Sequence, residues 1–233
     1  MSSTPKTIYI IRHGETTSNR KAVIQGSDEP LTDIGQKQAK KLGLRLKRDH
    51  VAYPIQCLLT SAYTRAVQTA EIIGACIEKT PHHYENAHER KHPSVIVGKS
   101  FSDAAIARIV NEGRKNFHDP SFVYGDGENF IQLKLRALAT LEYMLTLQEE
   151  HIALVTHGMF ATALAAASQR GKALTSQDIE HYQFRLSNTG LCTLVYRDRK
   201  TFSKDDTGWL ILKWNDIAHL ERHPELMEEW YRK

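Results

Sequence analysis

The chain has 233 residues, of which 41% are hydrophobic and 25% are charged, a balance typical of a globular protein that can bury a sizeable core. Its net charge of +4 comes from Lys and Arg residues scattered among acidic ones, which argues against a nucleic-acid-binding surface. Three widely spaced cysteines form neither a disulfide framework nor a CxxC site, and no apolar stretch reaches membrane-spanning length. We therefore expect a cytoplasmic protein without a nucleic-acid or membrane partner, and the sequence gives no indication of its oligomeric state.

Short β-branched and aromatic runs alternate along the chain with stretches whose apolar residues recur at helical spacing. In chain order we expect strand 7–11, helix 33–46, strand 55–59, helix 64–76, helix 102–117 capped by Ser102, helix 128–149, strand 152–156, helices 159–169 and 177–184, and strands 191–196 and 209–214. This alternation predicts an α/β fold, a three-layer α/β/α sandwich with a mostly parallel central sheet. We expect a single domain over 1–233, in which a helical and irregular insertion at about 81–126 covers one edge of the site.

The clearest chemical signal is Arg12-His13-Gly14, which follows the first expected strand. Open α/β sheets bind ligands at the carboxyl ends of their strands, so the position itself is informative. An imidazole attacks a phosphoryl group only through an unprotonated nitrogen, and an adjacent guanidinium both binds phosphate oxygens and keeps the imidazole neutral. Gly14 would let the backbone approach an anion. Taken alone, this run is as consistent with chance as with a phosphate site.

Further motifs resemble those of the histidine phosphatase superfamily, which includes the phosphoglycerate mutases, and the resemblance covers nearly the whole chain. Besides the run from Arg12 to Thr16, they are Asn19, Gln25-Gly26-Ser27-Asp28, Pro30-Leu31-Thr32, Gly35, the run Ser61 to Ala70, Gly127-Glu128-Asn129, Arg136, Thr156-His157-Gly158 and Ser187-Asn188-Thr189. The resemblance implies a metal-independent phosphatase that needs no cofactor. It implies a phosphohistidine intermediate and a substrate that is a phosphorylated small molecule or a phosphoprotein.

The resemblance also assigns roles to individual residues. His13 is the expected nucleophile, and a glutamate in the variable segment after Arg65 is expected to protonate the leaving oxygen and later to activate water. We take this acid to be Glu89, with Glu85 as the alternative, because the sequence departs from the common pattern here. The other expected site residues are His157 in the catalytic group and, for substrate binding, Arg12, Asn19, Gln25, Gly26, Arg65 and Gly158.

Two motifs suggest different chemistry. The run from His88 to His92 matches the zinc pattern HExxH, but Pro93 follows directly and disfavours the helix that the pattern needs. Gly98-Lys99-Ser100 resembles the end of a P-loop, but Pro93 stands where the first glycine of that loop should be. Since two arginines and a second histidine could supply the charge of Mg²⁺, we expect no metal site.

Two other functions compete with hydrolysis. The resemblance implies that a mutase carries Tyr-Gly after the arginine that follows the acid, and an adjacent pair of arginines further on. This chain has Lys91-His92-Pro93 at the first place and no Arg-Arg pair, which favours a phosphatase over phosphoglycerate-mutase-type transfer. A non-catalytic phospho-ligand-binding module would be marked by a missing catalytic residue, whereas Arg12, His13, Arg65 and His157 are all present.

Overall fold

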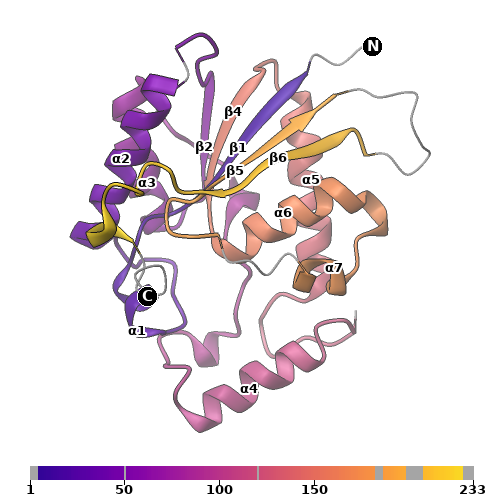
Figure 1. Ribbon diagram of the computed structural model, residues 1–233. Coiled ribbons are helices and arrows are strands. Elements are labelled where there is room, and N and C mark those ends of the chain that lie inside the picture. Colours follow the sequence, from indigo (N-terminus) through magenta and orange to yellow (C-terminus); the bar gives the residue numbers. More distant parts are fainter. Residues whose placement is uncertain (1–4, 50, 120, 182–185, 198–206, 228–233) are drawn as a thin grey trace.

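The structure is a computed structural model that describes residues 5–49, 51–119, 121–181, 186–197 and 207–227 (Figure 1). Its central sheet has the strand order β3-β2-β4-β1-β5-β6. The strands are β1 (Lys6–Arg12), β2 (Cys57–Thr60), β3 (His82–His83), β4 (His151–Thr156), β5 (Leu191–Tyr196) and β6 (Trp209–Asp216). β3, β2, β4 and β1 run parallel, whereas β5 runs antiparallel to both β1 and β6. The expected mostly parallel sheet is confirmed.

Helices cover both faces of this sheet, so the expected three-layer α/β/α fold is also confirmed. Figure 1 shows α2 and α3 on one face and α5 and α6 on the other. The helices are α1 (Thr17–Lys21), α2 (Asp33–Asp49), α3 (Thr64–Ile77), α4 (Ala104–Lys115), α5 (Phe130–Thr146), α6 (Gly158–Arg170) and α7 (Ser176–His181). Short 3₁₀ turns occur at η1 (Glu85–Ala87), η2 (Ser94–Ile96), η3 (Gly171–Ala173) and η4 (Pro224–Leu226). Within the described residues, no helix is long and apolar enough to cross a membrane.

The alternation of side chains along β1 divides the core into two layers. Ile8 and Ile10 pack in the cluster formed with α5 and α6, whereas Tyr9 and Ile11 pack in the cluster formed with α2 and α3. Successive residues of a strand point to opposite faces, so a strand with helices on both sides is apolar at every position. This explains why the expected strands read as continuous apolar runs in the sequence.

The helices α4 and α5 begin later than the sequence predicts. Ser102 does not cap α4; Asp103 does, because its carboxylate accepts hydrogen bonds from the backbone N–H groups of Ala105 and Ile106. α5 begins later than expected because Asn129 and Gln132 form a reciprocal capping box before it. The expected helix at 177–184 begins as α7, and its residues 182–184 lie outside the described residues.

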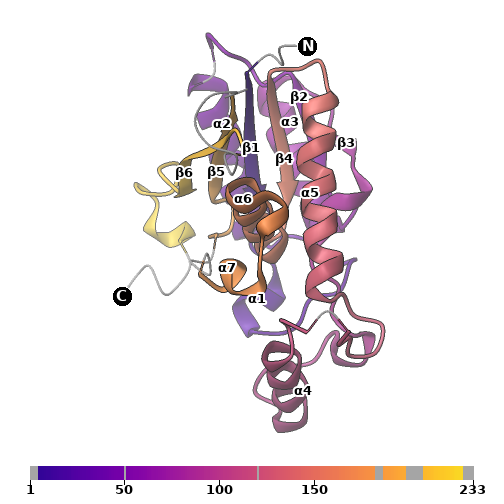
Figure 2. The same ribbon diagram turned by 90° about the vertical axis from the view of Figure 1, so that its right-hand side faces the viewer.

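The segment 81–126 begins in the sheet, because its residues 82–83 form β3 beside β2, and its later part, which includes α4, lies beyond the carboxyl ends of the parallel strands. Figures 1 and 2 both show α4 standing away from the sheet at this end of the molecule. A small apolar cluster of Ile24, Ile96 and Ile106 joins α4 to η2 and to the loop after α1. That this segment is an insertion within a single domain stays a prediction.

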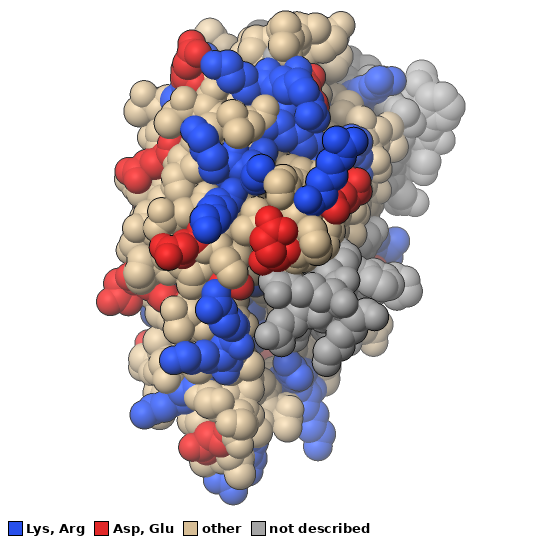
Figure 3. All heavy atoms as spheres, turned by 60° about the vertical axis from the view of Figure 1, so that its left-hand side comes forward, with Lys and Arg blue, Asp and Glu red and all other residues tan. Residues whose placement is uncertain are grey.

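One face of the molecule gathers basic side chains that are dispersed in the sequence. Figure 3 shows Lys and Arg over the upper part of this face, which is the side where α2 lies in Figure 1. Exposed basic residues of α2 are Lys37, Lys40, Lys47 and Arg48. Lys47 pairs with Glu78 and Arg48 with Asp49, so part of this charge is compensated locally.

The close packing of α2 on α3 yields a test of the fold. A Cβ atom added to Gly43 would lie 2.8 Å from Sγ of Cys76, so Gly43→Ala should lower the free energy of unfolding by about 1–3 kcal/mol. Gly113 in α4 has no atom within 4 Å of such a Cβ, and Gly113→Ala should stabilise by about 0.4–1 kcal/mol. Denaturant unfolding of both variants checks this. Changes of the same sign in the free energy of unfolding of the two variants would contradict the close contact between α2 and α3.

Candidate active site

The hydrogen bonds of the His13 ring fix its tautomer. His13 directly follows β1 and is buried, with its Nδ1 atom 2.7 Å from the carbonyl oxygen of Gly14. Because a carbonyl oxygen only accepts, Nδ1 must carry the ring proton. The Nε atom of Arg65 lies 3.1 Å from Nε2 of His13, and because a guanidinium only donates, Nε2 must carry the lone pair. The ring therefore presents an unprotonated Nε2 to the surrounding pocket.

The same surroundings keep this imidazole uncharged. Burial is the largest cause, and the charges of Arg65 and Arg12 add to it, so the pKa of His13 lies well below its usual 6.5. A neutral imidazole with an unprotonated Nε2 among cationic groups can act as a nucleophile toward an anionic phosphoryl group.

Arg65 is brought to His13 by the start of α3. Its side chain is almost fully buried, and its Nη1 atom donates to the carbonyl oxygen of Gly26 at 2.6 Å. Its guanidinium also lies over the ring of Tyr63, 5.2 Å from the centroid. Burial lowers the pKa of Arg65 while the charge of Glu89 raises it, yet an arginine stays charged near neutral pH. A desolvated positive charge thus faces the nucleophilic nitrogen of His13.

Arg12 and Gly158 lie against each other at the ends of neighbouring parallel strands. Arg12 ends β1 and its Nη1 atom donates to the carbonyl oxygen of Leu186 at 2.7 Å. Gly158 opens α6 after β4, and a Cβ atom added there would lie 3.6 Å from Nε of Arg12. The structure therefore brings both predicted residues to the same edge of the sheet as His13.

His157 lies beside His13 and has a buried nitrogen without a partner. The two ring centroids are 5.2 Å apart, and Nε2 of His157 lies 2.9 Å from Oγ of Ser61. The same Oγ accepts from the N–H of Tyr63 at 3.3 Å. Nδ1 of His157 is buried and has no hydrogen-bond partner among the described groups. A buried polar atom of this kind normally has a partner, and a bound group in the pocket could supply it.

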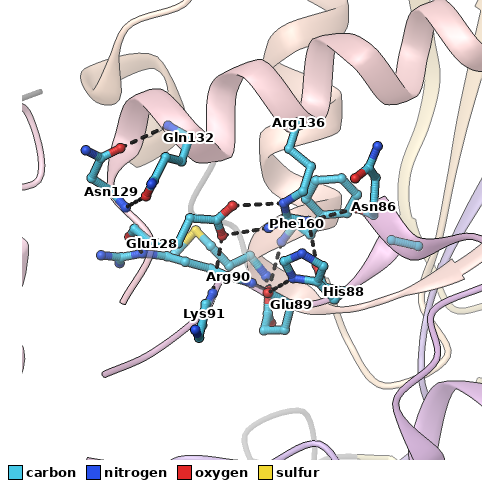
Figure 4. A network of polar contacts seen from close by, with 12 residues as sticks. Asn86, His88, Glu89, Arg90, Lys91, Glu128, Asn129, Gln132, Arg136 and Phe160 are labelled. Carbon is cyan, nitrogen blue, oxygen red and sulfur yellow. Dashed lines mark hydrogen bonds and ion pairs between the residues drawn. The ribbon is translucent and has the colours of Figure 1, made fainter. Parts of the chain in front are cut away.

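Glu89, and not Glu85, is brought to this group. The carboxylate of Glu89 accepts hydrogen bonds from the N–H groups of Met159 at 3.2 Å and Phe160 at 3.0 Å, in the first turn of α6. A helix N-terminus offers unpaired N–H groups to such an acceptor. Glu85 is exposed on η1, and Figure 4 shows Glu89 among the labelled residues that surround Phe160.

The half-buried side chains of Asn19 and Gln25 form hydrogen bonds within the loop after β1, and their predicted contact with substrate stays a prediction. Oδ1 of Asn19 accepts from the N–H of Thr16 at 3.1 Å and from Nδ2 of Asn188 at 3.1 Å. Gln25 donates to the hydroxyl of Thr16. Asn188 also donates to the carbonyl oxygen of His13 at 3.0 Å, so these side chains fix the backbone next to the nucleophile candidate.

Gly14 lies against the backbone of Gly35. A Cβ atom at Gly14 would lie 2.5 Å from the carbonyl oxygen of Gly35, at the start of α2. The missing side chain therefore allows a close contact between two backbone segments. That Gly14 also lets the backbone approach an anion stays a prediction.

Three residues near the site were not among the predicted site residues. Ser61 and Asn188 lie within motifs that resemble those of the family, so the sequence indicated that they are near the site. It did not indicate which residues they contact. His219 carries no sequence signal: it follows β6, and its Nε2 atom lies 2.8 Å from Oγ1 of Thr189. The N–H of Thr189 donates to the carbonyl oxygen of Arg12 at 3.1 Å. His219 is therefore connected through Thr189 to the backbone next to His13.

Neither rejected motif has the geometry of its family. His88 to His92 form an irregular segment between η1 and η2, so the HExxH pattern is not on a helix. Gly98-Lys99-Ser100 follows a 3₁₀ turn and not a strand. In the part of the chain that the structure describes, no three His, Cys, Asp or Glu side chains are grouped to hold a metal ion.

Comparisons with known proteins agree with this arrangement. The family described as histidine phosphatase superfamily (branch 1) matches residues 8–216. The "probable phosphoglycerate mutase GpmB" of an Enterobacter species is 27% identical, over 92% of this chain and 94% of that protein. A mycobacterial glucosyl-3-phosphoglycerate phosphatase superposes with a TM-score of 0.70 at 18% identity, over 91% of this chain and 99% of that one. A phosphoserine phosphatase from Entamoeba histolytica, bound to 3-phosphoglyceric acid, also gives 0.70 at 20% identity, over 92% and 99%.

The buried neutral histidines predict how stability depends on pH. Burial, with Arg45 adding to it, lowers the pKa of His219 to about 3, and the pKa values of His13 and His157 also lie well below 6.5. A depressed folded-state pKa means that the unfolded chain takes up the proton first, so stability is lost as the pH falls below 6.5. Each histidine should contribute a slope of about 1.4 kcal/mol per pH unit there.

Urea unfolding between about pH 7 and 5, where histidine titrates, measures this slope. His219→Gln should reduce it by about 1.4 kcal/mol per pH unit, because one proton uptake by the unfolded chain is removed. The same change at the exposed His83 is the control. An unaltered slope in the His219 variant would show that its protonation is not coupled to folding.

Proposed function

Because the chain belongs to the histidine phosphatase superfamily, we propose that it is a metal-independent phosphatase that hydrolyses a phosphomonoester through a phosphohistidine at His13. The observation that carries the proposal is the tautomer of His13, with Nδ1–H held by Gly14 and the Nε2 lone pair facing Arg65. A nucleophile must be unprotonated and aimed, and these two contacts meet both requirements.

In the first proposed step, Nε2 of His13 attacks the phosphorus atom in line with the leaving oxygen. A P–N bond forms as the P–O bond breaks, and the carboxyl group of Glu89 gives its proton to the leaving oxygen. Nε of Arg65 occupies the place in front of Nε2, so the phosphoryl group must replace that contact. The displaced guanidinium then binds the phosphoryl oxygens instead.

Charge on the transferring group is balanced by residues of this chain. In the proposal, Arg12 and Arg65 supply two guanidinium groups. Nδ1 of His157, which has no partner among the described groups and lies on the ring next to His13, carries the ring proton and donates a hydrogen bond to a phosphoryl oxygen. Such donors stabilise the charge that spreads over the equatorial oxygens during phosphoryl transfer. In this proposal they supply what Mg²⁺ supplies elsewhere, and Gly26, Asn19 and Gln25 hold Arg65 and the loop in place.

In the second proposed step, the carboxylate of Glu89 takes a proton from a water molecule that attacks phospho-His13. The P–N bond breaks, inorganic phosphate leaves, and both His13 and the protonated Glu89 are regenerated. In the proposal, the hydrogen bonds from Met159 and Phe160 hold the Glu89 carboxyl group at the start of α6, the helix that begins directly after His157, through both steps.

Phosphoglycerate-mutase-type transfer is the second candidate, because curated relatives carry that name. A mutase must also bind a second acidic group of its substrate. Arg90, which follows the proposed acid, packs over the ring of Phe117 at 4.3 Å and donates to the carbonyl oxygen of Glu128 at 3.3 Å. With Arg90 committed to these contacts, we favour hydrolysis of a phosphorylated small molecule. A screen of phosphorylated metabolites for release of inorganic phosphate decides between the two.

The phosphohistidine can be trapped. A ³²P-labelled phosphomonoester, quenched rapidly without acid and in the presence of EDTA, should leave an acid-labile, base-stable adduct on the protein. His13→Ala should abolish the adduct and lower kcat by more than about 10⁴-fold, the scale of losing a covalent nucleophile. His83→Ala serves as the control. An adduct that persists in His13→Ala would refute the nucleophile, and its loss in EDTA alone would refute metal independence.

The role of Glu89 can be separated from general damage by changing the leaving group. An alkoxide needs protonation to leave, whereas nitrophenolate does not. Glu89→Gln should therefore lower kcat by about 10²–10⁴-fold for an alkyl phosphate and much less for p-nitrophenyl phosphate. Glu85→Gln is the matched control, since Glu85 lies on the same segment but is exposed. Equal losses for both substrates in Glu89→Gln would show that Glu89 is not the acid.

A further inference from the structure

We propose that the buried ion pair of Glu128 and Arg136 is a positioning element that holds Glu89 in place for proton transfer. The inference rests on the proposed role of Glu89 and adds two residues to it. Neither residue contacts His13 in the described structure; both act on the backbone that carries the acid.

Arg136 holds the chain immediately before Glu89. From the second turn of α5, its Nη1 atom donates to the carbonyl oxygens of Asn86 at 2.8 Å and His88 at 2.7 Å. Figure 4 shows the Arg136 side chain reaching from the helix to this segment. Hydrogen bonds from a charged donor are about twice as strong as neutral ones, so these carbonyls are held firmly.

Glu128 holds the chain immediately after Glu89. Its Oε2 atom accepts from the N–H of Lys91 at 3.2 Å, its own N–H donates to the carbonyl oxygen of Lys91 at 2.8 Å, and its carbonyl oxygen accepts from Nε of Arg90 at 3.3 Å. Arg136 and Glu128 therefore hold the chain on the two sides of Glu89.

The pair itself is rigid and shielded from water. Nε and Nη2 of Arg136 donate to the two carboxylate oxygens of Glu128 at 2.8 Å and 2.6 Å, and both side chains are 8% exposed. A bidentate geometry fixes orientation as well as distance, and burial strengthens each bond. Removing one partner would leave the other charge buried and uncompensated.

The network also reaches the donors that bind the Glu89 carboxylate. The guanidinium of Arg136 lies over the ring of Phe160, 4.1 Å from its centroid, and the N–H of Phe160 donates to Oε1 of Glu89. One arginine thus contacts both the backbone that carries the acid and the residue that holds its carboxyl group. Glu89 itself lies on irregular chain between η1 and η2, without the support of a helix or strand.

Loss of this positioning should lower kcat more for a substrate with a poor leaving group than for one with a good leaving group. We call this difference in the loss of kcat the split. A misplacement of about 1 Å in a catalytic group costs up to ~10²-fold in rate. Arg136→Met should therefore lower kcat for an alkyl phosphate on the order of 10²-fold, while p-nitrophenyl phosphate changes little. Arg45→Met is the matched control: Arg45 forms an equally bidentate pair with Asp216, at 2.7 Å and 2.6 Å, between α2 and β6. It should show no split.

The double variant Glu89→Gln with Arg136→Met decides whether Arg136 acts through the acid. Its split should equal that of Glu89→Gln alone, because a residue that only positions Glu89 has no further effect once the acid is gone. If Arg136→Met does not fold, Arg136→Lys and Glu128→Gln replace it. Each of these variants keeps part of the polar contacts but disrupts the bidentate ion pair. Equal loss on both substrates in these variants would overturn the inference. Absence of a split in Glu89→Gln itself would instead overturn the proposed acid.

Discussion

The structure depends on one costly arrangement, a guanidinium buried against a neutral imidazole at the carboxyl edge of the sheet. Arg65 is almost fully buried, and its hydrogen bonds go to Nε2 of His13 and to the carbonyl oxygen of Gly26, neither of which carries a negative charge. A desolvated cation without a bonded carboxylate is unfavourable on its own. The same deficit of negative charge makes the pocket attractive to a phosphoryl group. Burial, with the charges of Arg65 and Arg12 adding to it, lowers the pKa of His13 and keeps it unprotonated.

The parallel part of the sheet places the groups that surround this arrangement. β1, β4 and β2 are neighbours that end at one edge, and the residues after them are His13, His157 and Ser61. Each needs only a strand followed by a turn into a helix, so their relative positions follow from strand order and register. Glu89 is the exception, because it lies on irregular chain and is held by contacts from α5 and α6.

This difference explains what the sequence could predict. The strand ends carry local motifs with strong periodic signals before them, so the sheet, its covering helices and the approach of Arg65 to His13 were predictable. The contacts of Glu89 were not, because the N–H donors that select it over Glu85 come from about seventy residues later in the chain. His219 was missed for the same reason. Ser102 and Asp103 both suit a helix cap, and only the backbone geometry selects the second.

The proposed phosphoryl-binding residues and the proposed acid are held in place by different parts of the structure. Of the groups proposed to bind the phosphoryl oxygens, Arg12 ends β1 and His157 follows β4, and residues of these two strands belong to both core clusters. Arg65 lies in the first turn of α3. The proposed acid sits on a segment whose position is set by the Glu128–Arg136 pair, and beyond that pair the segment continues into η2 and α4. Phe117, just after α4, packs against the guanidinium of Arg90, the residue next to the proposed acid, so this continuation also contributes to the placement of Glu89. In the proposed reaction, phosphoryl binding thus depends on the ends of core strands and on α3, whereas proton transfer depends on side-chain contacts made across an irregular segment.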